Sequence, residues 1–282
     1  MSEAAPTVAV VIPVHNGMPY LPHTLETVLS QSLRPTEIIV VENGSTDGTA
    51  DWLDQFDHPK VRVVTQDHLV SPAENWTTAV MAASADLVKL VCADDLLMPY
   101  ALERQSAALS AHPQAVMVAS YRKIVDQSGN VVAARRGLGS LRGEIPGQVA
   151  IKSCALRGVN AFGEAAAVMF RRAELQAAMP WDDSLPYVID LDLYSRVVAD
   201  RQVVMLPEVH AAFRLSAGSW TRNLSSLQQD HFNRWVDRLI ERGQLQLTGP
   251  ELTRARLMAA VQATARRAAY EYALLRDRAQ RS

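Results

Sequence analysis

Several features that define common protein classes are missing from this chain of 282 residues. It has only two cysteines, Cys92 and Cys154, far apart in the sequence, which suits a reducing compartment and argues against a cysteine-based metal cluster. No run of about 18 apolar residues is present to span a membrane, and the N-terminus lacks the pattern of a secretory signal. The net charge of −2 gives no sign of nucleic-acid binding. We therefore expect a cytoplasmic globular protein of one large or two small domains.

Two glycine-rich motifs that bind phosphate are also absent. No G-x-G-x-x-G follows the first predicted strand, and no G-x-x-x-x-G-K-[ST] occurs anywhere, so the usual dinucleotide fold and the P-loop are both disfavoured. If the protein binds phosphates, a metal ion held by carboxylates is the natural way to neutralise their charge.

Short apolar runs alternate with segments of helical periodicity in the N-terminal half. The runs predict strands at 8–14, 37–41, 61–64 and 87–92, and the periodic segments predict helices at 21–30, 49–56 and 75–83. Such alternation is typical of an α/β fold with a mostly parallel central sheet flanked by helices.

Two adjacent carboxylates, Asp94 and Asp95, follow the apolar run 87–92. At the end of a buried strand they would face the crevice where open α/β sheets bind ligands, and they would repel each other unless a cation were present. A hard divalent ion bridging carboxylate and phosphate oxygens fits this pattern. The alternative is that one aspartate caps the following helix.

The ordered set of motifs resembles glycosyltransferase family 2. The motifs are V-V-I-P-V-H-N at 10–16, I-V-V-E-N-G-S-T-D-G-T at 39–49 and A-D-D-L-L-M-P at 93–99. The resemblance implies the Rossmann-like GT-A fold in a domain at 1–222, with a nucleotide-sugar-binding half at 7–125 and an acceptor-binding half at 126–222. A C-terminal helical extension at 223–282 lies beyond the resemblance.

The resemblance also implies roles for residues of the first half. Asp95 would be the ligand of Mn²⁺ or Mg²⁺, and Asp94 would contact the ribose or sugar. The segment from Ser71 to Trp76 resembles one that closes the donor pocket in many relatives, and it contains Asn75. The remaining residues expected to bind the nucleotide are Pro13, Val14, Asn16, Glu42 and Asn43.

The second half carries the expected catalytic base. The segment 188–196 resembles the E-D-x-D-L-x-x-R pattern of the family, in which the Asp at the position of Asp190 is the general base of an inverting transfer. A base is needed because the acceptor hydroxyl must lose its proton as it attacks. Asp192 would point elsewhere if the segment is helical, and helix capping is the alternative role of Asp190. Asn160 and Glu164 are expected to contact substrate.

Two departures from the family pattern leave an alternative open. Ile189 replaces the family Glu, and Phe213-Arg214-Leu215-Ser216 lacks the His that ligates metal in many relatives. A non-catalytic nucleotide-sugar or glycan-binding protein on the same fold is therefore the second hypothesis. A nucleotidyltransferase is a third, but it usually has a basic glycine-rich loop after the first strand, which this chain lacks.

The overall prediction is an inverting glycosyltransferase of cell-surface polysaccharide or glycoconjugate synthesis. It would use a nucleotide-diphosphate sugar donor and a saccharide, lipid-linked or other hydroxyl acceptor. The last segment, 252–281, is rich in Arg and Ala. It predicts a helix that contacts the inner face of a membrane, packs against the core of the protein or forms a homodimer.

Overall fold

The computed structural model describes residues 5–216, 224 and 226–281, with side chains described as far as residue 272. The predicted domain boundary at 222/223 lies outside these residues. The strands are β1 (Val8–Val14), β2 (Glu37–Glu42), β3 (Val61–Thr65), β4 (Leu87–Leu90), β5 (Leu96–Leu97), β6 (Ala115–Val125), β7 (Val131–Arg136), β8 (Gly143–Pro146), β9 (Val168–Arg171) and β10 (Gln202–Arg214). The helices are α1 (Leu21–Leu29), α2 (Thr49–Gln55), α3 (Pro72–Met81), α4 (Ala101–Ala111), α5 (Gly147–Arg157), α6 (Arg172–Ala177), α7 (Ile189–Val198), α9 (Gln228–Glu241) and α10 (Gly249–Arg281).

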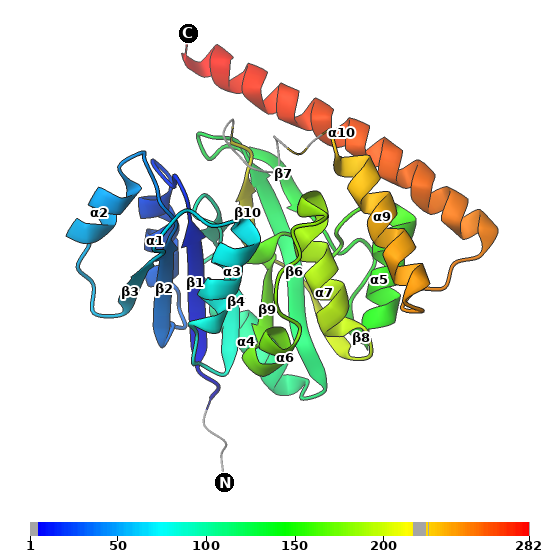
Figure 1. Ribbon diagram of the computed structural model, residues 1–282, viewed down its shortest axis with the longest axis horizontal. Coiled ribbons are helices and arrows are strands. Elements are labelled where there is room, and N and C mark those ends of the chain that lie inside the picture. Colours follow the sequence, from blue (N-terminus) through cyan, green and yellow to red (C-terminus); the bar gives the residue numbers. More distant parts are fainter. Residues whose placement is uncertain (1–4, 217–223, 225, 282) are drawn as a thin grey trace.

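One sheet runs through the centre of the molecule in the order β3-β2-β1-β4-β9-β6-β10-β5 (Figure 1). The strands β1 to β4 pair in parallel, as their continuous apolar runs predict. The strand β9 is antiparallel to both of its neighbours, β4 and β6. The expected α/β fold is confirmed, and the half of the sheet formed by β9, β6, β10 and β5 is mixed.

Each face of the sheet has its own hydrophobic core. Alternate residues of one strand point to opposite faces, so Val10 and Ile12 of β1 pack with α1 and α4, whereas Ala9 and Val11 pack on the side of α3 and α7. The helices α9 and α10 extend the second core, where Trp235 is fully buried. Both faces of β1 are therefore covered, so a ligand can bind only at the ends of the strands.

The long helix α10 crosses one end of the molecule and its last turns project beyond the body (Figure 1). Its inner face is a row of small buried residues, Ala255, Ala259 and Ala263. The backbone of α10 comes closest at Gly158, which ends α5 in the left-handed conformation (φ 64°). A Cβ atom on Gly158 would lie 2.5 Å from the carbonyl carbon of Met258, so this glycine permits α10 to dock.

We expect Gly158→Ala to detach α10 and lower the unfolding midpoint. The substitution combines left-handed strain of about 1–2 kcal/mol with a clash against the backbone of α10. Hydrogen exchange should rise along 249–281 and stay unchanged in β1. The matched control is Gly243→Ala, which has a similar φ of 69° but no atom within 4 Å of the added Cβ. Equal exchange in the two variants would contradict this account.

The glycine-rich segment 126–147 contains β7 and β8. The guanidinium of Arg135 lies 3.8 Å from the centre of the Tyr121 ring, and that of Arg142 lies 5.2 Å from it. The Tyr121 hydroxyl donates to the carbonyl of Gly139. Arg135 and Arg142 therefore pack against the body of the protein.

Candidate active site

The Asp94–Asp95 corner lies between β4 and β5 and is held from two sides. The Thr24 hydroxyl, from α1, donates to the carbonyls of Ala93 and Asp95, at 2.9 Å each. From β10, Arg214 donates through its Nε to the Asp94 carbonyl (3.0 Å) and through its amide to Asp95 Oδ1 (3.2 Å). The two aspartates therefore have fixed backbone positions at the carboxyl end of β4.

The carboxylate of Asp95 has a buried oxygen without a hydrogen-bond partner among the described residues, Oδ2. Burial raises the pKa of Asp95 well above its usual range, and the negative charges of Asp94 and Glu164 raise it further. Burial likewise raises the pKa of Asp94. Hard oxygen ligands that repel each other fit a hard divalent cation.

Ser216 stands where the family pattern has its His. Its hydroxyl lies 3.5 Å from Asp94 Oδ2, so this position does face the corner. The nearby His210 is bonded to Glu208 instead, at 3.2 Å. No three His, Cys, Asp or Glu side chains gather as a metal site in the part of the chain that the structure describes. A bound cation would therefore need oxygen atoms from the nucleotide or from water.

The polar residues after β2 hold together the loops expected to bind the nucleotide. Glu42 is buried, and its carboxylate accepts from the amides of Gly44 (3.1 Å) and Ser45 (2.6 Å). Asn43 exchanges two hydrogen bonds with the backbone of Val70. The structure thus uses both side chains to brace the loops.

The residues after β1 are divided between the core and the surface. Pro13 and Val14 are buried in the sheet, whereas Asn16 is exposed and has a left-handed backbone (φ 53°). The Asn16 Oδ1 accepts from the amide of Thr46 at 2.8 Å. Asn75 is buried in α3 and accepts from Gln66 Nε2 at 3.3 Å. Of these four, Asn16 has the side chain most open to a ligand.

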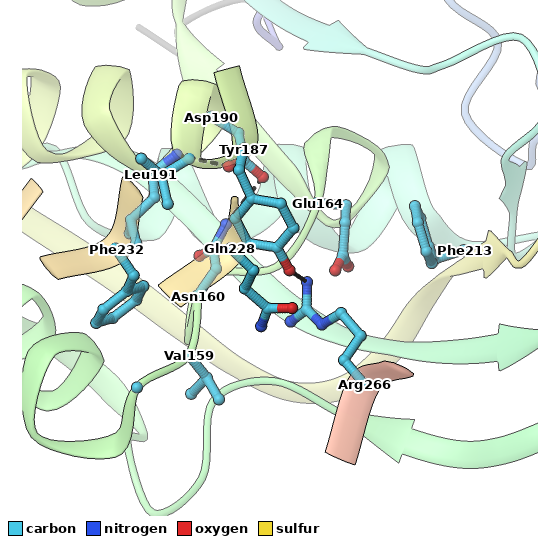
Figure 2. A pocket seen from close by; sticks show the side chains of 12 residues that line it. Val159, Asn160, Glu164, Tyr187, Asp190, Leu191, Phe213, Gln228, Phe232 and Arg266 are labelled. Atoms are coloured by element: carbon cyan, nitrogen blue, oxygen red, sulfur yellow. Dashed lines mark hydrogen bonds between the residues drawn. The ribbon is translucent and has the colours of Figure 1, made fainter. Parts of the chain in front are cut away.

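Asp190 begins the helix α7 and lines a cavity of about 60 Å³ (Figure 2). Its Oδ2 accepts from Asn160 Nδ2 (3.0 Å), and its Oδ1 accepts from the amide of Leu191 (2.7 Å). Burial and the negative charge of Glu164 raise the pKa of Asp190 to about 7. A carboxylate held in one orientation with a pKa near neutrality is suited to accept a proton.

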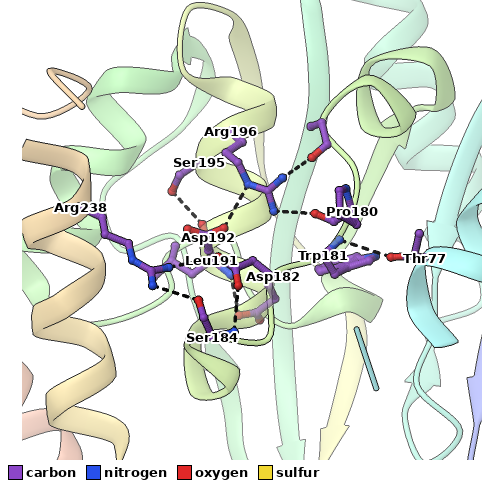
Figure 3. Close-up of polar contacts among 12 residues, drawn as sticks. Thr77, Pro180, Trp181, Asp182, Ser184, Leu191, Asp192, Ser195, Arg196 and Arg238 are labelled. Carbon is purple, nitrogen blue, oxygen red and sulfur yellow. Dashed lines mark hydrogen bonds and ion pairs between the residues drawn. The ribbon is translucent and has the colours of Figure 1, made fainter. Parts of the chain in front are cut away.

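Asp192 faces away from this cavity. It is buried and its Oδ2 accepts from Arg196 Nε at 3.1 Å (Figure 3). Arg196 also donates to the carbonyls of Ala178 and Pro180. The sequence prediction that only one of the two aspartates points into the site agrees with this geometry.

Glu164 and Asn160 support the site by different contacts. The Glu164 carboxylate forms an ion pair with Arg122 of β6, with a hydrogen bond of 2.8 Å from Nη2. Asn160 accepts from the amides of Phe162 and Gly163, and this fixes the amide that donates to Asp190. Asn160 thus orients the expected base.

Cys92 connects the two halves of the site. Burial raises the pKa of its thiol, and the carboxylates of Asp95, Asp94, Asp190 and Glu164 raise it further. Since the charges of both halves act on this one thiol, the Asp94–Asp95 corner and Asp190 converge on the same region at the end of β4.

The sequence analysis did not identify three residues at the site: Tyr187 and Arg266, which line the cavity, and Arg122, which pairs with Glu164. Tyr187, Arg122 and Arg266 were not singled out, although Arg266 reaches the cavity from α10 and donates to the Tyr187 hydroxyl (Figure 2). The one available signal was an arginine at the end of an apolar strand, Arg122. Nothing in the periodicity of α10 marks Arg266 among its other arginines.

The mixed sheet, with paired carboxylates at the end of β4 and a third carboxylate on α7, has the GT-A type of fold. The chain matches the family "Glycosyl transferase family 2" over residues 9–174. It therefore belongs to this family.

Individual relatives agree with this assignment. Glycosyltransferase GlyG of Streptococcus pneumoniae is 26% identical over 125 residues, which are 44% of this chain and 42% of that protein. The chain thus matches less than half the length of this relative. Among solved structures, S. aureus TarS residues 1–349 in complex with UDP-GlcNAc has a TM-score of 0.67 at 15% identity, covering 90% of this chain and 70% of that one. The mannosyltransferase PcManGT of Pyrobaculum calidifontis, in complex with GDP-Man and Mn²⁺, has a TM-score of 0.59 at 16% identity and covers 98% and 76%.

Proposed function

We propose that this protein is a glycosyltransferase that inverts the anomeric configuration of its sugar and uses Asp190 as the general base. The supporting observation is the Asp190 carboxylate itself, which lines a cavity, is oriented by Asn160 and Leu191, and has a pKa raised to about 7. In a single displacement, the acceptor hydroxyl attacks the anomeric carbon while its proton passes to Asp190. The diphosphate leaves on the opposite face of the sugar.

The donor would be a nucleotide-diphosphate sugar bound at the carboxyl ends of β1, β2 and β4. Glu42 and Asn43 shape this pocket by bracing its loops, and Asp94 would contact the ribose or sugar. The buried Oδ2 of Asp95 is the atom best placed to ligate Mn²⁺ or Mg²⁺. When bound, such an ion would stabilise negative charge on the leaving diphosphate.

A non-catalytic binding protein on the same fold remains the second candidate. Ser216 in place of His and Ile189 in place of Glu favour it. The tuned pKa and fixed orientation of Asp190 favour catalysis, because a sugar-binding site has no need for a carboxylate that titrates near pH 7.

The acceptor would be a saccharide, a lipid-linked saccharide or another hydroxyl compound. No helix among the described residues is long and apolar enough to cross a membrane. The outer face of α10 carries the exposed side chains of Leu257, Val261 and Tyr272. Peripheral membrane contact or a homodimer through this face remains a prediction.

A donor screen followed by product analysis tests the proposal. UDP, GDP and TDP should be compared, each with and without Mn²⁺, by the shift in unfolding midpoint. We expect one base to give the largest shift, and the matching α-linked donor to yield a β-linked product by the anomeric proton coupling in NMR. An α-linked product would contradict inversion, and the absence of turnover with every donor would favour the non-catalytic alternative.

A further inference from the structure

Four arginines from four different elements lie close to one another beside Glu164. We call them the arginine cluster: Arg122 of β6, Arg136 of β7, Arg157 of α5 and Arg266 of α10. Arg122 pairs with Glu164, and Arg266 donates to the Tyr187 hydroxyl with its guanidinium 5.5 Å from the centre of that ring. Elements far apart in the sequence therefore bring positive charge to one place.

The positive charge of the cluster exceeds the negative charge beside it. Four guanidinium groups face two carboxylates, Glu164 and Asp190, so at least two positive charges are left without a counter-charge among these groups. Burial lowers the pKa of Arg136, and the positive charges of Arg122 and Arg266 lower it further. The groups therefore lie near enough to repel one another, and an anion among them would relieve that repulsion.

The cluster also has hydrogen-bond donors to spare. Arg122 is 5% exposed, and its Nη1 is buried without a hydrogen-bond partner among the described residues; the same holds for Nη1 of Arg157. A buried donor without a partner is destabilising, and more so when it is charged. The turn between β7 and β8 covers both groups, since a Cβ on Gly137 would lie 2.8 Å from Arg122 Nη1 and a Cβ on Gly139 would clash with Arg157 Nη1.

We propose that the arginine cluster binds a phosphate group carried by the acceptor, next to the hydroxyl that attacks the sugar. This inference rests on the proposed function and adds the chemical class of the acceptor. A phosphate ester carries up to two negative charges, which matches the two positive charges left without a counter-charge. One guanidinium group can also donate two parallel hydrogen bonds to two phosphate oxygens. The cavity beside Asp190 is lined by Arg266 and, at about 60 Å³, has room for a small anion.

Arg266 would then select the acceptor. Its present partner, the Tyr187 hydroxyl, is neutral, and hydrogen bonds between two charged groups are the stronger kind. A phosphate entering the cavity would compete for Arg266 and draw it away from Tyr187, which widens the cavity toward Asp190. The C-terminal helix would in this way contribute to the choice of substrate.

Binding of a phosphorylated sugar and its unphosphorylated form tests the proposal. N-acetylglucosamine 1-phosphate and N-acetylglucosamine should be titrated by calorimetry into the full chain, with and without saturating UDP. We expect the phosphate to bind at least about tenfold more tightly, with the difference shrinking as salt is added. Equal binding of the two sugars would overturn the proposal.

Matched variants locate the site. Arg136→Gln and Arg266→Gln should each weaken binding of the sugar phosphate about 3–10-fold and leave binding of the free sugar unchanged. Arg135→Gln is the control, because Arg135 is exposed like its neighbour but stacks on Tyr121 and donates to the Pro207 carbonyl. An equal loss in Arg135→Gln would overturn the assignment to the cluster.

Two further measurements are needed. One separates the possible sources of the phosphate, and the other distinguishes a failure of the phosphate site from a failure of the proposed function. A short-chain prenyl diphosphate carrying the same sugar should bind more tightly than the sugar phosphate if the acceptor is lipid-linked, and no more tightly if the acceptor is a free phosphate; either result supports the subsite. Failure of wild type to bind any nucleoside diphosphate would contradict the proposed function, and the titrations without UDP would still decide the phosphate site.

Discussion

Asp190→Asn should slow sugar transfer by about 10²–10⁴-fold, the usual contribution of a general base. The amide can keep contacts with Asn160 and with the Leu191 amide, but it cannot take the proton of the acceptor hydroxyl. Binding of the nucleoside diphosphate should be unchanged, because Asp190 lies on the acceptor side. The measurements are kcat at saturating donor and Kd for the nucleotide by calorimetry.

Asp192→Asn is the control that the chain itself offers. Asp192 lies on the same helix and is buried, but its carboxylate pairs with Arg196 outside the cavity (Figure 3). The variant should lose stability, since removing one partner of a buried ion pair is costly, and the folded fraction should keep its kcat. A wild-type rate in Asp190→Asn, or an equal loss of kcat in both variants, would remove Asp190 from the mechanism.

The pH dependence of the rate gives a separate test of the same residue. Because the pKa of Asp190 is raised to about 7, the base is protonated at lower pH, so the wild-type rate should rise through pH 7 and level off above it. The folded protein also holds this proton more tightly than the unfolded chain. Its contribution to stability is therefore present below the unfolded pKa of about 4 and is lost as the pH rises through 7. The residual rate of Asp190→Asn should show no rise in this window.

The parts of the fold that sequence could predict are those with local signals. The strands β1 and β2 are continuous apolar runs that stop at polar residues, and their bounds were predicted to within one residue. The start of α3 was predicted three residues late, at Asn75 in place of Pro72. The signal was present, because Ser71 accepts from the amide of Glu74 as a helix cap and Pro72 suits the first turn.

The parts that could not be predicted depend on contacts distant in sequence. The run Ala165–Phe170 is apolar, but nothing in it says that β9 inserts between β4 and β6 with the opposite direction. The position of Arg266 depends on how α10 docks at Gly158. The motifs therefore point to the base and the Asp94–Asp95 corner, whereas the part of the cavity wall that α10 supplies could be identified only from the fold.

Asp95→Asn should remove most of the stabilisation that Mn²⁺ gives in the presence of the nucleoside diphosphate. A ligand at a hundredfold excess over its Kd stabilises a protein by about 2.7 kcal/mol, which for a chain of this size corresponds to a rise in the unfolding midpoint of about 5 °C. The buried Oδ2 of Asp95 is the oxygen left free for a cation, and an amide in its place has lost the charge. Without metal, the variant should be at least as stable as wild type, because the buried charge beside Asp94 is gone.

The control for this prediction is Asp126→Asn. Asp126 is also fully buried, but its two oxygens accept from the amide (2.8 Å) and the side chain (3.1 Å) of Asn130. We expect this variant to lose stability and to keep the full Mn²⁺-dependent rise. The two carboxylates differ mainly in whether an oxygen is free, so opposite responses would assign the cation to Asp95. A full rise in Asp95→Asn would show instead that the cation is held by the nucleotide alone, and the carboxylate corner would then need another explanation.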